Sequence, residues 1–381
     1  MNIIYIFSIL LLLVISFSKK LQAKLLSISI ISTLIIILSS RTNLDEYQRY
    51  LDLLKTNYPK LTDYSLFNEP LYALLGNFVN SYTTSPLFFL YLISYTIIFI
   101  CLYKSSYIIS KDWKATNFSI LFYLCHFFIS YAFSGIRGGV ANSLCALSAV
   151  LFFKNRNLIS IPISIAAALV HLQTIAFSIL MFSIPLIKRI GIYTLTILRK
   201  VKKLILTLGL AVIISVIIYL SSYFRESISI LLMNIFKSSG IDMKYIYYIS
   251  DEIYGRTLDL SSTQFLASIS LTFVFIILLF SKKEKMPLYI ENLTYLYSTV
   301  PIIMILFSDT ALYAFRLAST FNTLLIPLIS YLWINTYPYK NRLIHSSNYT
   351  YSKTKILMIL IAFAMLYYNI FYMKRFNGFS L

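Results

Sequence analysis

Charged residues are scarce in this chain, and acidic ones are scarcer than basic ones. Of its 381 residues, 12% are charged and 59% hydrophobic, with 14 Asp and Glu against 33 Lys and Arg. So few charges, with a mean hydropathy of +0.77, exclude an ordinary soluble domain. The shortage of acids leaves a formal net charge of +19. The positions of the basic residues along the chain must therefore show whether these residues bind a nucleic acid or reflect membrane topology.

The chain has few cysteines and lacks the common nucleotide-binding and metal-binding motifs. The three cysteines, Cys101, Cys125 and Cys145, lie inside or beside apolar runs, without metal or redox spacing. We therefore assign them to packing and expect no disulfide framework. The sequence contains no HExxH, CxxC, P-loop or GxGxxG motif, so metal proteases, ATPases and dinucleotide enzymes have no support.

Long apolar runs are abundant instead. A membrane-spanning helix needs about 20 mostly apolar residues at about 1.5 Å each, and the runs lack the alternation of a transmembrane barrel. We predict an all-α, polytopic integral membrane protein of about 12 transmembrane or re-entrant helices. The first run is predicted to be a retained span, because it lacks a basic leader and a cleavage pattern. The predicted segments are 3–18, 25–39, 86–103, 117–134, 139–153, 158–170, 173–187, 204–222, 264–280, 288–307, 311–333 and 356–373.

Basic residues gather in alternate connections between these segments. By the positive-inside rule the base-rich connections are cytoplasmic, which places the N- and C-termini outside. Membrane topology therefore explains the net charge, and we predict no nucleic-acid partner. The acids on that side are few (Asp112, Glu284 and Glu291). The base-rich connections are 19–24, 104–116, 154–157, 188–203, 281–287 and 334–355.

Under this topology the segment 157–188 must turn back on itself. It has cytoplasmic bases on both sides, and at about 1.5 Å per residue it is too long for one span and short for two. We predict a hairpin of short helices with Pro162 and Pro185 in its arms. His171 then lies at the turn, at or just below the outer surface.

Two outer connections, 40–85 and 223–263, are too long to be simple turns, and long ordered loops often carry function. The tail of the first, 70–82, is apolar and amphipathic, so it lies in the interface or re-enters the membrane. The second is predicted to form a folded lid. We find no linker between soluble domains and no repeat, so we predict that residues 1–381 form a single polytopic membrane domain.

Residues able to do chemistry converge on the outer face. An arginine or histidine at the end of an apolar segment is costly unless it faces a protein interior or a wet cavity. Two arginines match a phosphate and can neutralise a diphosphate leaving group, while a carboxylate or imidazole can deprotonate a hydroxyl. These parts predict a transferase acting on a lipid-linked substrate. The candidates are Arg137, His171, Asp309 and Arg316, with Asp45 and Glu69 from the first outer connection.

Each candidate also has a purely structural explanation. Arg137 can snorkel or bind a helix-end carbonyl, and His171 can cap the turn. Glu69 can simply open the amphipathic stretch, and Asp309 can form an ion pair with Arg316, seven residues away on one helix face.

Short motifs follow one another in a set order over about residues 40 to 330. They are an outer Asp and Tyr (Asp45, Tyr50), a Glu that opens an apolar stretch (Glu69), an Arg that leads a small-residue helix (Arg137), a His after an Ala-rich run (His171) and an Arg that begins a helix ending in Ile-Pro (Arg316 to Pro327). This order resembles the EpsG-like branch of the Wzy-type polysaccharide polymerases. Members of that branch often have Gln after the first Arg, where this chain has Gly138.

The resemblance implies a fold, a reaction and partners. It implies a GT-C-like polymerase with an outer-face active site in the bacterial plasma membrane. A growing glycan on undecaprenyl diphosphate would be transferred to the next lipid-linked repeat unit. The transfer needs no nucleotide cofactor, and we expect no metal. Besides the lipid-linked donor and acceptor, the expected partners are membrane lipid, a chain-length regulator and a flippase.

The resemblance also implies roles for single residues. Arg137 and Arg316 would bind the diphosphate, and Glu69 and Asp309 would order the site. The base or acceptor-positioning group would be either His171 or Asp45, and Tyr50 would contact the substrate.

Three other functions compete with polymerisation. An O-antigen ligase would use the same donor with a lipid A-core acceptor, and the sequence does not separate the two. A flippase or other transporter would place its polar residues near the bilayer midplane, whereas the candidates here gather at one surface. A membrane O-acyltransferase rests on the histidine alone. A gene neighbourhood with sugar transferases and a separate flippase would favour the polymerase.

Overall fold

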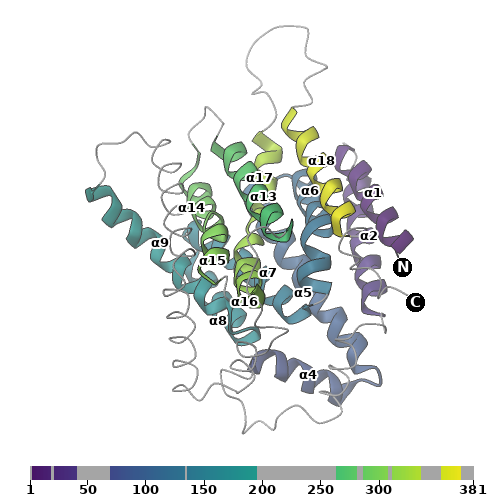
Figure 1. Cartoon of the computed structure of the whole chain (residues 1–381). Coiled ribbons are helices and arrows are strands. Elements are labelled where there is room, and N and C mark those ends of the chain that lie inside the picture. Colours follow the sequence, from purple (N-terminus) through teal and green to yellow (C-terminus); the bar gives the residue numbers. More distant parts are fainter. Residues whose placement is uncertain are drawn as a thin grey trace, which may run out of the picture. The chain divides into compact units, whose positions relative to one another are not determined.

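The described part of the chain is helical (Figure 1). In the computed structural model, every regular element within the described residues is a helix, which confirms the all-α prediction. The predicted segment 204–222 and residues 223–262 of the second outer connection lie outside the described residues. The structure describes residues 2–18, 21–40, 69–133, 135–194, 263–280, 286–307, 311–335 and 353–369.

The chain divides into two compact units, Met1–His171 with Leu325–Leu381, and Leu172–Leu324. A single polytopic domain stays a prediction, since one domain can contain two such units. The described helices of the first unit are α1 (Asn2–Phe17), α2 (Leu21–Ser39), α4 (Pro70–Tyr82), α5 (Pro86–Ser110), α6 (Trp113–Tyr123), the π-helix η3 (Leu124–Phe133), α7 (Ile136–Phe153), α8 (Asn157–Val170), α17 (Leu325–Asn335) and α18 (Lys353–Tyr367).

Helix α5 forms the centre of the first unit, where it contacts α2, α4, α6, α7 and α17. It begins at Pro86, whose fixed φ suits the first helical position. It ends before Lys111, which adopts the left-handed conformation. The next residue, Asp112, caps α6, because its side chain accepts a hydrogen bond of 3.0 Å from the N–H of Lys114. Local sequence therefore fixes the sharp reversal between α5 and α6.

Helices α7 and α8 form a closely packed hairpin, turned by Asn155 in the left-handed conformation. Each of the buried Ser148 and Ser160 donates its hydroxyl to the carbonyl of the other, at 2.9 Å in both directions. Small residues allow such close helix contact within a membrane. With 18 residues, α7 is about 27 Å long, so Lys154 and Arg156 lie at the opposite end from the start of α7 and the end of α8.

Two predicted segments are broken where prolines interrupt the helical hydrogen bonds. The segment 288–307 forms α14 (Leu288–Tyr297) and α15 (Val300–Leu306), with Pro301 in the first turn of α15. The segment 311–333 forms α16 (Ala311–Asn322) and α17, which contains Pro327.

The second unit contains α13 (Thr263–Phe280), α14, α15, α16 and α9 (Thr174–Thr194). Helix α16 contacts α9, α14 and α15, and the rings of Phe177 and Phe321 lie 5.0 Å apart between α9 and α16. The break between α8 and α9 falls at residues 171–173, where the hairpin turn was predicted. Whether these two arms cross the membrane stays a prediction.

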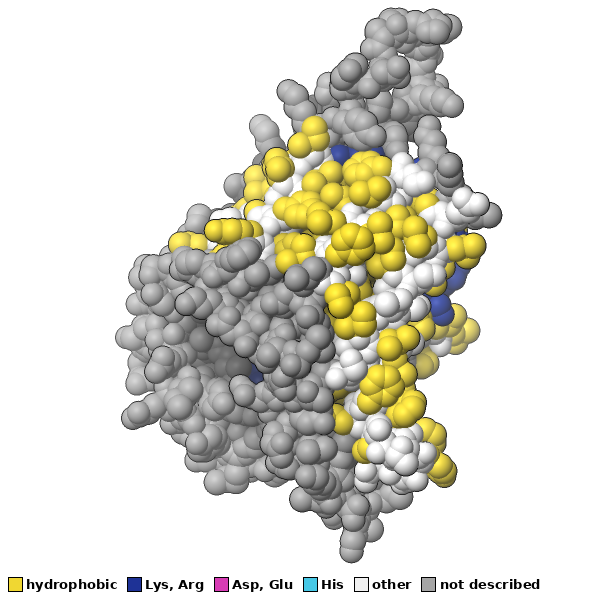
Figure 2. All heavy atoms as spheres, turned by 90° about the vertical axis from the view of Figure 1, so that its right-hand side faces the viewer, with side chains coloured by type: hydrophobic (Ala, Val, Ile, Leu, Met, Phe, Trp, Pro, Cys, Tyr) yellow, Lys and Arg dark blue, Asp and Glu magenta, His cyan; other side chains and the backbone are white. Residues whose placement is uncertain are grey.

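Apolar side chains cover much of the described surface. Figure 2 shows hydrophobic side chains across one face, with few Lys or Arg visible. Large apolar side chains such as Phe7, Val14 and Leu360 are more than half exposed, which suits a lipid environment and not water. By length and composition, four helical stretches among the described residues can cross a membrane, namely Gln22–Ser39, Pro86–Ser110, Ile136–Phe153 and Ala314–Asn335. The last of them contains the break between α16 and α17. The full number of spans stays a prediction.

Candidate active site

Arg137 lies in the first turn of α7, preceded by the N-cap Gly135. The N–H of Gly139 donates to the carbonyl of Gly135 at 2.9 Å and so closes the first helical turn. Gly135 has no side chain with which to cap the remaining amides, which leaves a partial positive charge at this end of α7. The Arg137 side chain is 23% exposed, so it is anchored in protein and still reaches the surface.

His171 ends α8, and the α7–α8 hairpin brings it beside the start of α7. Its backbone is extended, and its N–H donates to the carbonyl of Ala167 at 2.9 Å. A Cβ atom added to Gly138 would lie 3.8 Å from Cδ2 of the imidazole. The His171 side chain is 14% exposed. Glycine at position 138 therefore leaves room against one edge of the ring.

Glu69, at the start of α4, lies beside Arg137 and His171. It is the N-cap residue of α4, with φ 53° and ψ 60°, although it directly precedes Pro70. The left-handed conformation is unfavourable for a residue with a side chain, and a following proline restricts that residue further. The Glu69 carbonyl accepts hydrogen bonds from the N–H groups of Tyr72 and Ala73. Strain of this kind is often found at functional sites.

Packing of α4 holds Glu69 in this conformation. The buried side chains of Tyr72, Ala73 and Val79 lie on the inner face of α4, which contacts α5 and α8. The Tyr72 hydroxyl lies 3.4 Å from the hydroxyl of Ser94 on α5. The Glu69 side chain makes no capping bond to α4, because its carboxylate points into the site.

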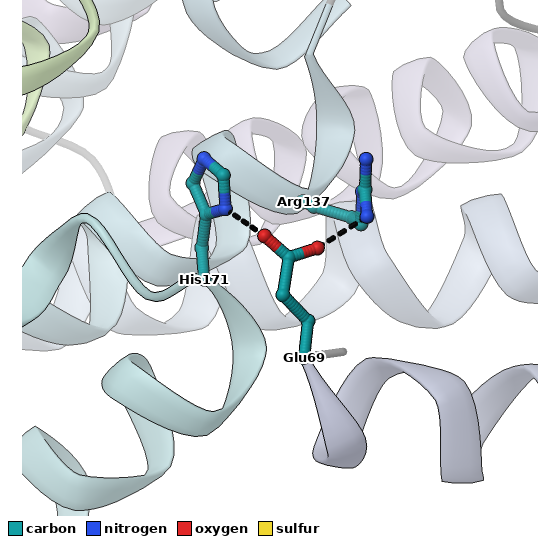
Figure 3. A network of polar contacts seen from close by, with 3 residues as sticks. All are labelled: Glu69, Arg137 and His171. Atoms are coloured by element: carbon teal, nitrogen blue, oxygen red, sulfur yellow. Dashed lines mark hydrogen bonds and ion pairs between the residues drawn. The ribbon is translucent and has the colours of Figure 1, made fainter. Parts of the chain in front are cut away.

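The Glu69 carboxylate joins the arginine and the histidine (Figure 3). One carboxylate oxygen, Oε2, accepts a hydrogen bond from Nη1 of Arg137. The other, Oε1, binds Nδ1 of His171. An ionised carboxylate can only accept, so His171 donates from Nδ1. In the neutral ring the lone pair then belongs to Nε2.

The charges of this Glu69–Arg137–His171 triad nearly cancel. The formal charge is zero with a neutral imidazole and +1 with an imidazolium. The Glu69 side chain is only 6% exposed, and a buried carboxylate persists as an ion only where charged or donating partners surround it. The triad therefore holds an arginine and a histidine in fixed orientation through one shared anion, and its chemistry suits anion binding and proton transfer.

The other predicted site residues are placed less completely. Arg316 lies on α16 of the second unit and is partly exposed, and its grouping with Arg137 stays a prediction. Asp45, Tyr50 and Asp309 lie outside the described residues. Among the described residues, no group of three His, Cys, Asp or Glu could hold a metal ion.

Sequence reasoning missed two polar side chains that bind η3, the helix before Arg137. Tyr5 and Asn369 bind backbone carbonyls of η3, and both are buried. An amide within an apolar run was the available signal for Asn369, since such a group needs a polar partner in a membrane. Nothing in the sequence distinguishes Tyr5 from the many other tyrosines.

Comparison with known proteins gives one family. The EpsG family model matches residues 24–380, nearly the whole chain. No curated protein and no solved structure matches. The apolar helices and the match together identify a membrane protein of polysaccharide biosynthesis. The chain belongs to the EpsG family, a family of polysaccharide polymerase-like proteins.

Proposed function

We propose that this protein is a repeat-unit polymerase of bacterial surface polysaccharide. It transfers the growing glycan from undecaprenyl diphosphate to the next lipid-linked repeat unit, at the outer face of the plasma membrane. The proposal includes about 12 spans, both termini outside and a GT-C-like architecture. The observation that carries it is the single carboxylate of Glu69 that binds both Arg137 and His171, together with the family.

The reaction needs a base and a stabilised leaving group. A hydroxyl oxygen of the acceptor sugar attacks the anomeric carbon of the donor. The bond between that carbon and the diphosphate oxygen breaks, and the diphosphate leaves with the electron pair. The hydroxyl proton passes to a base, for which we assign Nε2 of His171. Hydrogen bonding of Nδ1 to Glu69 sets the tautomer in which Nε2 can accept it.

Arg137 is the residue for the diphosphate. A guanidinium has five N–H donors in a planar fork, so it can bind Glu69 and a phosphate oxygen at the same time. The N-terminus of α7 adds a favourable partial charge for an anion beside it. Stabilising the charge that develops on the leaving diphosphate lowers the barrier to transfer.

The triad alone does not match the charge of a diphosphate. With a neutral imidazole its formal charge is zero, so a further cation is needed to neutralise the substrate. Arg316 of α16 is our candidate for that cation, with Asp309 ordering it. Asp45 and Tyr50 are assigned to the acceptor, with Asp45 as the alternative base.

Purified protein in liposomes, supplied with a lipid-diphosphate-linked repeat unit, tests the proposal. Arg137→Ala and His171→Ala are each expected to abolish long-chain product while single repeat units persist. Arg156→Ala is the matched control, because it removes an exposed arginine from the opposite end of the α7–α8 hairpin. Normal chain-length distributions from both site variants, at matched protein levels, would refute the proposal. Transfer only to an acceptor that is not a repeat unit would identify a ligase instead.

A further inference from the structure

The helix that leads to Arg137 is not an α-helix. After Tyr123 the chain of α6 continues as the π-helix η3, which ends at Phe133, shortly before the N-cap Gly135 of α7. A π-helix of this length is unusual, because i→i+5 hydrogen bonding is commonly limited to a single turn. Such turns are often found at functional sites. Something outside the segment must therefore stabilise the π register.

Two buried side chains from the ends of the chain bind successive carbonyls at the start of η3. The Tyr5 hydroxyl of α1 donates to the carbonyl of Leu124 at 2.6 Å. Nδ2 of Asn369, which follows α18, donates to the carbonyls of Cys125 and His126, both at 3.2 Å. Tyr5 is 1% exposed and Asn369 is 2% exposed. None of these three bonds belongs to the regular hydrogen bonding of a helix.

Aromatic packing holds the same stretch from another side. Phe128 of η3 is fully buried. Its ring lies 6.0 Å from that of Tyr5, 5.5 Å from that of Tyr95 and 6.1 Å from that of Phe99. Tyr5 therefore contacts η3 twice, once through its ring and once through its hydroxyl. The packing resists rotation of η3, while the hydrogen bonds select its register.

These bonds add second donors to carbonyls of η3. A carbonyl oxygen has two lone pairs, so it can accept a bond from the N–H five residues on and another from a side chain of a neighbouring helix. Placing a polar side chain in the hydrocarbon region costs free energy unless the side chain forms hydrogen bonds of this kind. Donors of Tyr5 and Asn369 meet three consecutive carbonyls, those of residues 124–126, which is the pattern expected of a clamp on the backbone.

We propose that Tyr5 and Asn369 are positioning residues that hold η3 in the π register and thereby set the place of Arg137. The inference rests on the proposed function of Arg137 as the diphosphate binder. Relaxation of η3 by one residue toward the α register would shift the start of α7 by about 1.5 Å and rotate it by roughly 100°. Helix η3 contacts α7, so such a shift would move the first turn of α7 away from Glu69.

The expected effect is a loss of rate without a loss of substrate affinity. A displacement of about 1 Å in a catalytic group can lower a rate by about 10²-fold. Tyr5→Phe and Asn369→Leu each remove the donors while keeping much of the volume. We expect the double variant to lower kcat by about 10²-fold, with KM for the lipid-linked donor changed by less than about threefold because Arg316, assigned to the same diphosphate, remains in place.

Amide hydrogen exchange supplies a readout that does not depend on activity. In the double variant, exchange should become faster at residues 124–137 and stay unchanged at residues 144–153 in the distal part of α7. The matched controls are Asn335→Leu, which removes a 3.0 Å amide bond to the Tyr331 carbonyl within α17, and Ser8→Ala, which removes a 2.8 Å bond within α1. Both controls should keep wild-type kcat and wild-type exchange at residues 124–137.

Amide hydrogen exchange and kcat together test the inference. Faster exchange at 124–137 with a fall in kcat supports it. Faster exchange with unchanged kcat, a fall in kcat with unchanged exchange, or faster exchange throughout the chain each overturns it. Arg137→Ala is assayed alongside. If that variant polymerises normally, the proposed function fails. If it is inactive while the clamp variants polymerise at the wild-type rate, only the present inference fails.

Discussion

Replacing Glu69 with Gln should separate the two partners of its carboxylate. The wild-type carboxylate accepts hydrogen bonds from Arg137 and His171 at its two oxygens. The amide of Gln has the same shape but one acceptor and one donor end. With the amide oxygen toward Arg137, the NH₂ group can bind Nδ1 only if the ring changes tautomer, and Nε2 then carries the proton. With the oxygen toward His171, two donors face each other at Arg137.

The size of each effect can be estimated from the contacts and the burial of the side chains. Removing one partner of a buried ion pair costs about 3–5 kcal/mol, and a hydrogen bond to a charged group contributes about 1.5–3 kcal/mol. Because Arg137 keeps 23% exposure, water compensates part of the loss, and we expect Glu69→Gln to destabilise the protein by about 2 kcal/mol. A histidine in the wrong tautomer, or an arginine turned away, should lower kcat by about 10²- to 10⁴-fold.

The assay combines thermal unfolding in detergent with polymerisation in liposomes. Asp112→Asn is the control, because it also converts an N-cap acid to an amide in the same unit, and asparagine caps a helix as well as aspartate. The control should keep both stability and kcat. A Glu69→Gln variant with wild-type kcat would refute the assignment of the carboxylate as the group that orients the base and the arginine.

Further predictions at three residues concern the α7–α8 hairpin and the edges of the site. Ser148→Ala removes the Ser148 hydroxyl, which donates a hydrogen bond to the Ser160 carbonyl, and should lower the free energy of unfolding by about 1 kcal/mol. This loss is expected to appear as a lower Tm, and an unchanged Tm would contradict the prediction. Gly138→Ala should be tolerated, since its Cβ would make an ordinary contact with His171 at 3.8 Å. Gly138→Leu should cover that ring edge and raise KM for the acceptor at least tenfold, and a wild-type KM would show that the edge is not used. Arg137→Lys should keep the charge and lose the paired geometry, so that kcat falls by about 10-fold or more; full activity would show that charge alone suffices.

The helices could be predicted from sequence because a membrane imposes a simple rule. Apolar runs form helices there to satisfy their backbone groups internally, and α5, α7 and α8 begin within three residues of the predicted segments. The break at His171 could be predicted from the length of 157–188 between two basic clusters. Arg137, His171 and Glu69 were candidates because each is polar at the edge of an apolar run.

The features that the sequence could not predict depend on contacts between distant residues. Glu69 is 68 residues from Arg137 and 102 from His171, and a left-handed residue before proline is locally unfavourable. Contacts of α4 with α5 and α8, and those of the Glu69 carboxylate with Arg137 and His171, stabilise that conformation. The π register of η3 is likewise invisible in composition, since Tyr5 and Asn369 stabilise it from positions 119 to 244 residues away.

A mutant cycle between Arg137 and His171 tests most directly whether Glu69 makes them one reaction centre. Sugar transfer would be measured for Arg137→Ala, His171→Ala and the double variant, at matched protein levels in the same liposomes. Groups that act as a unit show strongly non-additive losses. We predict that the double variant loses about as much kcat as the more damaged single variant. Losses that multiply would mean that the two residues act independently, and would contradict the account.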